Sequence, residues 1–163
     1  MRYTTHVISS LAIAVPVMAV TDTFAVGAIA AVALGSLFPD IDEPNSWIGK
    51  RTMGISKVMN WLFGHRGITH SLFGALAIAA IFMLIANIFT VPAIVFAYFM
   101  MGYLLHLFGD SFSKSGVPWL LPFCKKNYQS GFGYVYYVTG KSSEMAVFVV
   151  FFVCLLGELF VFL

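Results

Sequence analysis

Histidine is scarce in this chain, and each copy stands in a short polar motif at the end of an apolar segment. The four histidines occur in Thr5-His6, in His65-Arg66-Gly67-Ile68-Thr69-His70-Ser71 and in His106-Leu107-Phe108-Gly109-Asp110. The motif Pro39-Asp40-Ile41-Asp42 adds two carboxylates in a similar place. Imidazole and carboxylate together are the usual ligand set of a catalytic divalent metal. These motifs therefore predict a metal site.

His106 and Asp110 are the pair with the clearest spacing. Residues four apart on a helix share one face, so the two side chains can act on the same ion. Ionisable side chains within an apolar segment are costly and usually functional. We therefore expect His106 to bind metal, with Asp110 either as a second ligand or as the group that orients the ring. The alternative is a hydrogen-bonded pair that serves packing alone.

The segment from His65 to His70 suits a loop that enters a helix, with His70 in the first turn. Both histidines are candidate ligands, and the alternative is a polar cap at the membrane surface. Arg66 lies between them, and its guanidinium can bind phosphate or carboxylate in a bidentate way. A cation that only marks the membrane boundary is an equal alternative for Arg66.

Asp40 and Asp42 follow Pro39, which stops the preceding helix. Asp40 is the preferred ligand, and Asp42 is a candidate general base; a solvated acidic turn is the alternative. His6 has the weakest local context, although it opens an apolar run as His70 does. The predicted metal ligands are His6, Asp40, His65, His70, His106 and Asp110.

The composition places the chain in a membrane. Its 163 residues are 60% hydrophobic and 10% charged, and the mean hydropathy is +0.91, whereas an ordinary soluble domain is about 25% charged. So much apolar surface needs lipid to cover it. The net charge of +2 is too small to suggest a nucleic-acid partner. Cys124 and Cys154 form no disulfide framework and are expected to be unpaired thiols.

Five apolar segments are separated by polar stretches; they cover residues 7–20, 24–38, 68–88, 91–112 and 144–163. A spanning helix needs about 20 apolar residues, which the last three segments provide. The first two are shorter, and either span with their ends included or form a helical hairpin. Residues 55–63 have helical amphipathic spacing and predict an interfacial helix. We expect an all-α polytopic membrane bundle of about five hydrophobic helices, in a single domain over residues 1–163 with a loop at 113–143.

The charges predict the topology. If the segments span, the N-terminus and both long loops share one side, which then holds all nine Lys and Arg residues. Cytoplasmic loops carry the excess of these residues, so this side is predicted to be cytoplasmic in an inner membrane. All candidate ligands fall on the same side. A cleaved signal peptide is disfavoured because the N-terminus has one cation and no clean cleavage site.

These motifs, with Gly35-Ser36-Leu37-Phe38 before the Pro-Asp pair, resemble the YdjM-type family of inner-membrane metal-dependent hydrolases. The resemblance covers most of residues 1–123 and implies a divalent-metal enzyme. The order of His and Asp is also similar to zinc-dependent phospholipase C and the P1-type nucleases, which are all-helical phosphodiesterases with clustered zinc. The chain has no histidine after His106, so one or two ions are expected rather than three.

The expected function is metal-dependent hydrolysis of a phosphoester, such as a phospholipid or a lipid phosphate, at the cytoplasmic membrane face. Zinc is the favoured ion because of the imidazole content, with manganese or iron as alternatives. Arg66 would hold the phosphate and Asp42 would serve as base. A non-enzymatic protein with a structural metal site is one alternative. A divalent-metal transporter is another, and it predicts ligands spread along a path at mid-membrane depth.

Overall fold

The computed structural model describes residues 1–52, 54–64 and 66–162 and confirms the all-α prediction. The α-helices of this described part are α1 (Tyr3–Val20), α2 (Val26–Leu37), α3 (Ile55–Phe63), α4 (Leu72–Phe89), α5 (Ala93–Ser111) and α6 (Ser142–Phe162). Three short 3-10 helices join them: η1 (Phe38–Asp42), η2 (Gly49–Arg51) and η3 (Ile68–His70). The long loop after α5 contributes isolated β-bridges rather than a named strand.

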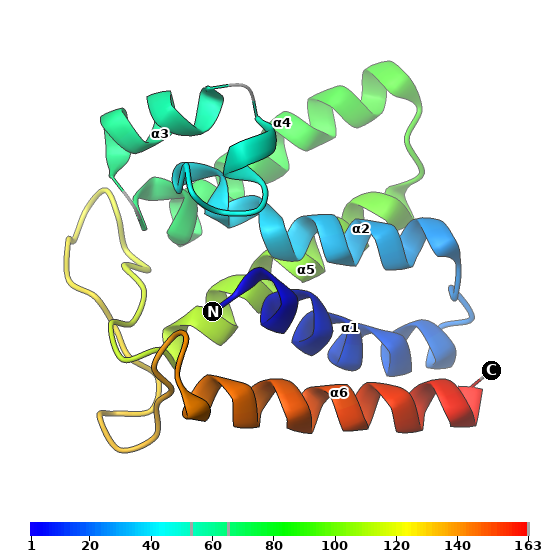
Figure 1. Cartoon of the computed structure of the whole chain (residues 1–163). Coiled ribbons are helices and arrows are strands. Elements are labelled where there is room, and N and C mark those ends of the chain that lie inside the picture. Colours follow the sequence, from blue (N-terminus) through cyan, green and yellow to red (C-terminus); the bar gives the residue numbers. More distant parts are fainter. Residues whose placement is uncertain (53, 65, 163) are drawn as a thin grey trace.

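Four helices, α1, α4, α5 and α6, are long and apolar enough to cross a membrane. The twelve residues of α2 extend only about 18 Å at the α-helical rise, which is too short to cross alone. Of the two short segments, α1 therefore reaches spanning length, and α2 folds back beside it after the turn that follows Val20 (Figure 1). The helix predicted at residues 55–63 is confirmed as α3.

The tightest packing in the bundle joins α2 to α5, and glycine makes it possible. A Cβ atom at Gly35 would lie 2.0 Å from the carbonyl oxygen of Phe99, and one at Gly102 would lie 2.2 Å from that of Val32. Small residues let membrane helices approach this closely, since lipid tails give helices little hydrophobic reason to associate. The two glycines therefore fix the end of α2 against the middle of α5.

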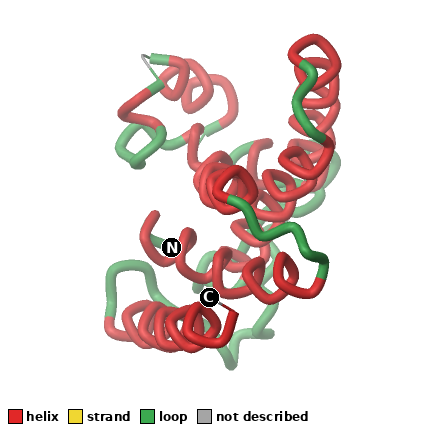
Figure 2. Tube along the Cα trace, turned by 90° about the vertical axis from the view of Figure 1, so that its right-hand side faces the viewer, coloured by secondary structure: helices red, strands yellow, loops and turns green. Residues whose placement is uncertain are grey.

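The other helices are arranged around this pair. α1 packs against α2, α5 and α6 and buries Ala14 and Met18. α4 and α6 expose most of their length, including Leu84 at 67% and Val150 at 60%. Figure 2 shows α6 lying along the outside of α1. These outer faces carry the apolar surface that the composition assigns to lipid.

The connections divide between the two ends of the bundle. Short turns link α1 to α2 and α4 to α5 at one end, and the long loops and the N-terminus lie at the other (Figure 1). Arg2 precedes α1, and the other eight cations lie within residues 50–66 and 114–141, so every cation lies toward the loop end. This is also the end at which α1 begins and α5 finishes, the helices that carry three of the predicted ligands.

Candidate metal centre

Four separate elements bring five of the six predicted metal ligands to the loop end of the bundle. His6 comes from the start of α1, Asp40 from η1 and His70 from η3. His106 and Asp110 come from the last turns of α5. The three histidines and Asp110 are at most 2% exposed, and the Asp40 side chain is 17% exposed. The ligands form two overlapping groups that could hold a metal ion, with His106 in both.

The first group is Asp40, His70 and His106. The Nε2 atoms of the two histidines lie 3.3 Å apart, and Asp40 Oδ1 lies 3.6 Å from that of His70 and 3.7 Å from that of His106. Two ligands bound tetrahedrally to zinc at 2.0–2.1 Å lie about 3.3 Å apart. The spacing of these three atoms is thus close to that of a zinc ligand set.

The second group is His6, His106 and Asp110. The His6 ring stacks on the His106 ring, with centroids 3.6 Å apart and planes at 10°. His6 Nε2 lies 3.4 Å from Asp110 Oδ1, beyond ordinary hydrogen-bond range. Within the described residues, neither ring nitrogen of His6 has a hydrogen-bond partner, although both are buried. A buried imidazole whose nitrogens make no hydrogen bond fits a position at which one nitrogen faces an ion.

His106 is oriented by the end of α2. Its Nδ1 donates to the backbone carbonyl of Ser36 at 2.6 Å, which assigns the proton to Nδ1 and leaves the lone pair of Nε2 for an ion. Such an outer hydrogen bond is typical of metal-binding histidines. One Nε2 atom coordinates one ion, so the two overlapping groups compete for His106 rather than forming two full sites.

Asp42, predicted as a general base, lies behind His70. It is fully buried, and its Oδ2 accepts from His70 Nδ1 at 3.1 Å, from the Thr69 hydroxyl at 2.6 Å and from Gly67 N at 3.1 Å. The carboxylate thus holds the His70 ring with Nε2 toward His106. Catalysis by Asp42 as a base stays a prediction, and this burial does not favour it.

The two ligands outside the spanning helices have shifted pKa values. Burial lowers the pKa of His70, but the adjacent carboxylates of Asp40 and Asp42 outweigh that effect and raise it to about 9. Burial raises the pKa of Asp40, but the attraction of the nearby His106 and His70 rings outweighs that effect and holds the pKa well below its usual range. Without metal, His70 is thus a cation between two carboxylates.

Arg66 joins the site through Asp110. Its Nη2 donates to Asp110 Oδ2 at 2.6 Å, and its Nη1 donates to Ser113, to Ser115 and to the carbonyl of Gly116. The amino-terminal ammonium group also contacts Asp110, at 2.5 Å from Oδ1. Arg66 therefore fastens the start of the long loop to the ligand carboxylate, and its predicted role as a phosphate clamp stays a prediction.

Sequence reasoning missed two residues that support the ligands, Tyr137 and Thr69. The Tyr137 hydroxyl donates to Asp110 Oδ1 at 3.0 Å, and burial together with the Asp110 charge raises its pKa, so the hydroxyl keeps its proton. Tyr137 lies in an aromatic run whose sequence indicates loop and turn or a short strand, so no local signal marked it as a functional residue. Thr69 lies inside a recognised motif, but its contact with Asp42 depends on folding.

The predicted ligand His65 lies outside the described residues.

A pocket of about 320 Å³ reaches Asp40 from the loop side. Its walls include Tyr3, Glu43 and Trp47. Asp40 is the one ligand of the five with appreciable exposure, and this pocket explains why. Of the five ligands, Asp40 is therefore the one that water and small polar groups can reach from this pocket.

Two curated relatives from enteric bacteria match the chain at the same level. The inner membrane protein YdjM of Escherichia coli (strain K12) and that of Shigella flexneri are each 37% identical over 126 residues, covering 72% of this chain and 63% of theirs. The protein YvsG of Bacillus subtilis (strain 168) is 37% identical over 94 residues, covering 55% of this chain and 54% of its own. The chain thus spans less than two thirds of the length of these relatives.

No solved structure matches the chain, so the more distant similarity to phospholipase C and the P1-type nucleases is not supported and stays a hypothesis. The family model described as YdjM inner membrane protein matches residues 1–162. That match includes every predicted ligand as well as the last helix, which carries no motif. Together with the identity to the enteric relatives, it shows that the chain belongs to the YdjM family of inner membrane proteins.

Proposed function

We propose that this inner membrane protein is a metal-dependent hydrolase that cleaves a phosphoester of a membrane lipid or lipid phosphate. The observation that carries the proposal is the cluster of three histidines and two aspartates, drawn from four elements and buried at one end of a membrane bundle. Ionisable groups in such a place are expensive to keep and generally serve a function.

The donor set fits one divalent ion. Asp40, His70 and His106 would hold it, with His6 and Asp110 beside them. Imidazole nitrogens favour zinc, and manganese or iron also accept this set. When bound, such an ion supplies Lewis-acid activation of water and of a phosphoryl oxygen.

The surrounding residues keep these ligands in place. Asp42 fixes the tautomer and direction of His70, and the Ser36 carbonyl does the same for His106. Tyr137 and Arg66 hold Asp110. The Arg66 side chain is 16% exposed, so its cation lies within reach of a phosphate at the cluster, which supports the clamp role.

Two features favour an enzyme over the alternatives. A structural metal site is closed, whereas a catalytic one keeps an open position, and here a pocket reaches Asp40. A transporter needs ligands along a path through the membrane, whereas these ligands lie together near the ends of α1 and α5. The cation-rich end supports a cytoplasmic position for the cluster.

The test is hydrolysis by detergent-purified protein loaded with zinc, with long-chain phosphatidate in mixed micelles and p-nitrophenyl phosphate as parallel substrates. We expect zinc-dependent phosphate release from phosphatidate that is lost in Asp40→Asn. Asp22→Asn, at an exposed position between α1 and α2, is the matched control and should keep full activity. Cleavage of the soluble ester alone would reject the lipid substrate, and failure to bind zinc, manganese or iron would reject the hydrolase.

A further inference from the structure

A second pocket, of about 280 Å³, lies on the membrane side of the ligand cluster. It is bounded by α1, α5, α6 and the loop at residues 135–137. α6 packs against α1 and α5 packs against α1 and α2, but in the described part of the chain α5 and α6 share no substantial contact. The pocket occupies the space that this arrangement leaves.

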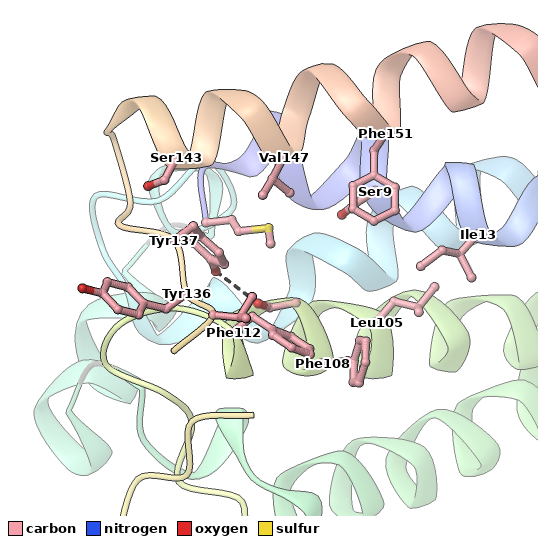
Figure 3. A pocket seen from close by; sticks show the side chains of 13 residues that line it. Ser9, Ile13, Leu105, Phe108, Phe112, Tyr136, Tyr137, Ser143, Val147 and Phe151 are labelled. Atoms are coloured by element: carbon pink, nitrogen blue, oxygen red, sulfur yellow. Dashed lines mark hydrogen bonds between the residues drawn. The ribbon is translucent and has the colours of Figure 1, made fainter. Parts of the chain in front are cut away.

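The pocket is polar at one end and apolar along most of its length; the exception is Ser9 beside Phe151, whose hydroxyl donates to the His6 carbonyl at 3.3 Å. Figure 3 shows Tyr137 and Ser143 at one end, and Ile13, Leu105 and Phe151 toward the other. Along α6 the lining runs from Ser143 to Phe151, which is about 12 Å at the α-helical rise. The long axis therefore follows the spanning helices, from the loop end into the apolar part of the bundle.

The polar end is also a wall of the ligand cluster. Tyr137 lines the pocket and donates to Asp110 Oδ1 at 3.0 Å. Gly109 lines it too; a Cβ at Gly109 would meet the Met1 side chain first, at 3.3 Å from Cε, and would lie 4.0 Å from His6 Nδ1. A molecule with its tail in the pocket would thus have its head against Met1 and Tyr137, both of which contact Asp110.

The pocket is open at its side. Phe108 and Ile13 both line it, yet they are 53% and 37% exposed. They belong to helices long and apolar enough to cross the membrane, so the medium at this side is lipid. An occupant can therefore enter from the bilayer without passing through water.

We propose that this pocket binds one acyl chain of a membrane lipid and sets the lipid headgroup against the ligand cluster. The apolar walls, the axis along the helices and the side opening fit a hydrocarbon chain, and the polar end fits the headgroup to which it is attached. This inference rests on the proposed function for its substrate, but chain binding itself needs neither metal nor turnover.

The test uses photo-crosslinking in vesicles of equal parts phosphatidylethanolamine and phosphatidylglycerol, doped with a phosphatidylcholine that carries a diazirine near the end of one acyl chain. Labelled residues are located by mass spectrometry in protein with and without chelator. We expect labelling at Leu105 and Phe151 several-fold above that at Leu84, a lipid-exposed residue of α4.

The deciding variants are Val147→Trp, which fills the pocket, and Val150→Trp, on the outer face of the same helix and 60% exposed. We expect several-fold less labelling at Leu105 in the first and no change in the second. If Val147→Trp does not fold, Leu105→Phe takes its place, and labelling is then measured at Phe151. Leu104→Phe, outside the pocket, is the control. Even labelling along all exposed helices, or equal effects of the two tryptophans, would overturn the proposal.

Chelation separates this inference from the proposed function. Labelling that persists without metal, in a protein that hydrolyses no phosphoester, would support the chain pocket and reject the hydrolase. Zinc-dependent hydrolysis with unselective labelling would support the hydrolase and reject the acyl-chain pocket.

Discussion

The Nε2 atoms of His70 and His106 face each other at 3.3 Å, although one residue ends a 3-10 turn and the other lies in α5. Each ring is turned to this position from behind, His70 by Asp42 and His106 by the Ser36 carbonyl. The distance between the two Nε2 atoms therefore matches the distance between two ligand atoms of a tetrahedral zinc site.

Zinc should bind at one ion per chain, because a single Nε2 atom of His106 serves both ligand groups. His106→Ala should abolish stoichiometric binding, whereas His6→Ala should weaken it and leave the Asp40 and His70 ligands in place. Elemental mass spectrometry of detergent-purified protein measures both. Two ions per wild-type chain, or one retained in His106→Ala, would contradict the shared-ligand geometry.

Replacing Asp42 by Asn should weaken zinc binding by about 10-fold to 100-fold, the usual effect of losing an outer carboxylate behind a metal-bound histidine. Asn keeps the volume but removes the charge that holds His70. Competition with a chromogenic chelator gives the affinity. Asp22→Asn should bind zinc as wild type does; an equal loss in the two variants would mean that the effect is not specific to His70.

Zinc affinity should rise with pH. The metal-free protein keeps His70 protonated up to a pKa of about 9, and an ion needs the unprotonated nitrogen, so binding displaces a proton. Below that pKa the affinity should increase about tenfold per pH unit for one displaced proton. Titration calorimetry in buffers of different ionisation enthalpy counts the proton, and a pH-independent affinity would show that His70 is not a ligand.

The same raised pKa has a consequence for the metal-free protein. A group whose pKa is higher in the folded state stabilises that state below its ordinary pKa of 6.5 and loses this contribution as pH rises through about 9. Thermal unfolding followed with chelator present should therefore show a falling midpoint over this window. Protein with zinc bound should lack this contribution, since its His70 is already unprotonated.

Gly102→Ala should disturb the metal centre from outside it. The new methyl group would lie 2.2 Å from the carbonyl oxygen of Val32, so α2 must move away from α5 and carry Ser36 away from His106. Overpacking of this kind costs about 1–3 kcal/mol. We expect lower thermal stability together with weaker zinc binding. Gly27→Ala, on α2 with open space around it, should change neither.

The loop end should face the cytoplasm. In a Cys154→Ser background, Cys124 in the long loop should resist a membrane-impermeant maleimide in intact spheroplasts and react after permeabilisation. A cysteine at exposed Asn87, placed in a chain without its two natural cysteines, should react at once. The opposite pattern would invert the topology that the charges predict.

Much of this architecture follows from the sequence because apolar length and charge position act locally. The segment at residues 55–63 emerged with the predicted bounds as α3, and His106 and Asp110 lie together as their spacing requires. The short α2 was ambiguous because twelve apolar residues fit a hairpin as well as a span with extended ends. Its position was decided by the close approaches of Gly35 to Phe99 and of Gly102 to Val32, which join segments far apart in the sequence.

The support of the ligands was harder to predict. The spacing of Asp40 and Asp42 does not reveal which of the two side chains faces His70 Nδ1. Asp42 proved to be the supporting carboxylate and Asp40 the accessible one. Tyr137 reaches Asp110 only because a long loop returns to the end of α5. Such contacts are set by loop folding, for which periodicity gives no signal.

The sharing of ligands among α1, η1, η3 and α5 also constrains biosynthesis. During synthesis His6 enters the membrane first, and the cluster remains incomplete until His106 and Asp110 follow at the end of α5. Only then can the full ligand set capture an ion, so loading comes after insertion and from the loop side. A chain halted before α5 would therefore hold His6, Asp40 and His70 without the two ligands of that helix, and its ligand set would be incomplete.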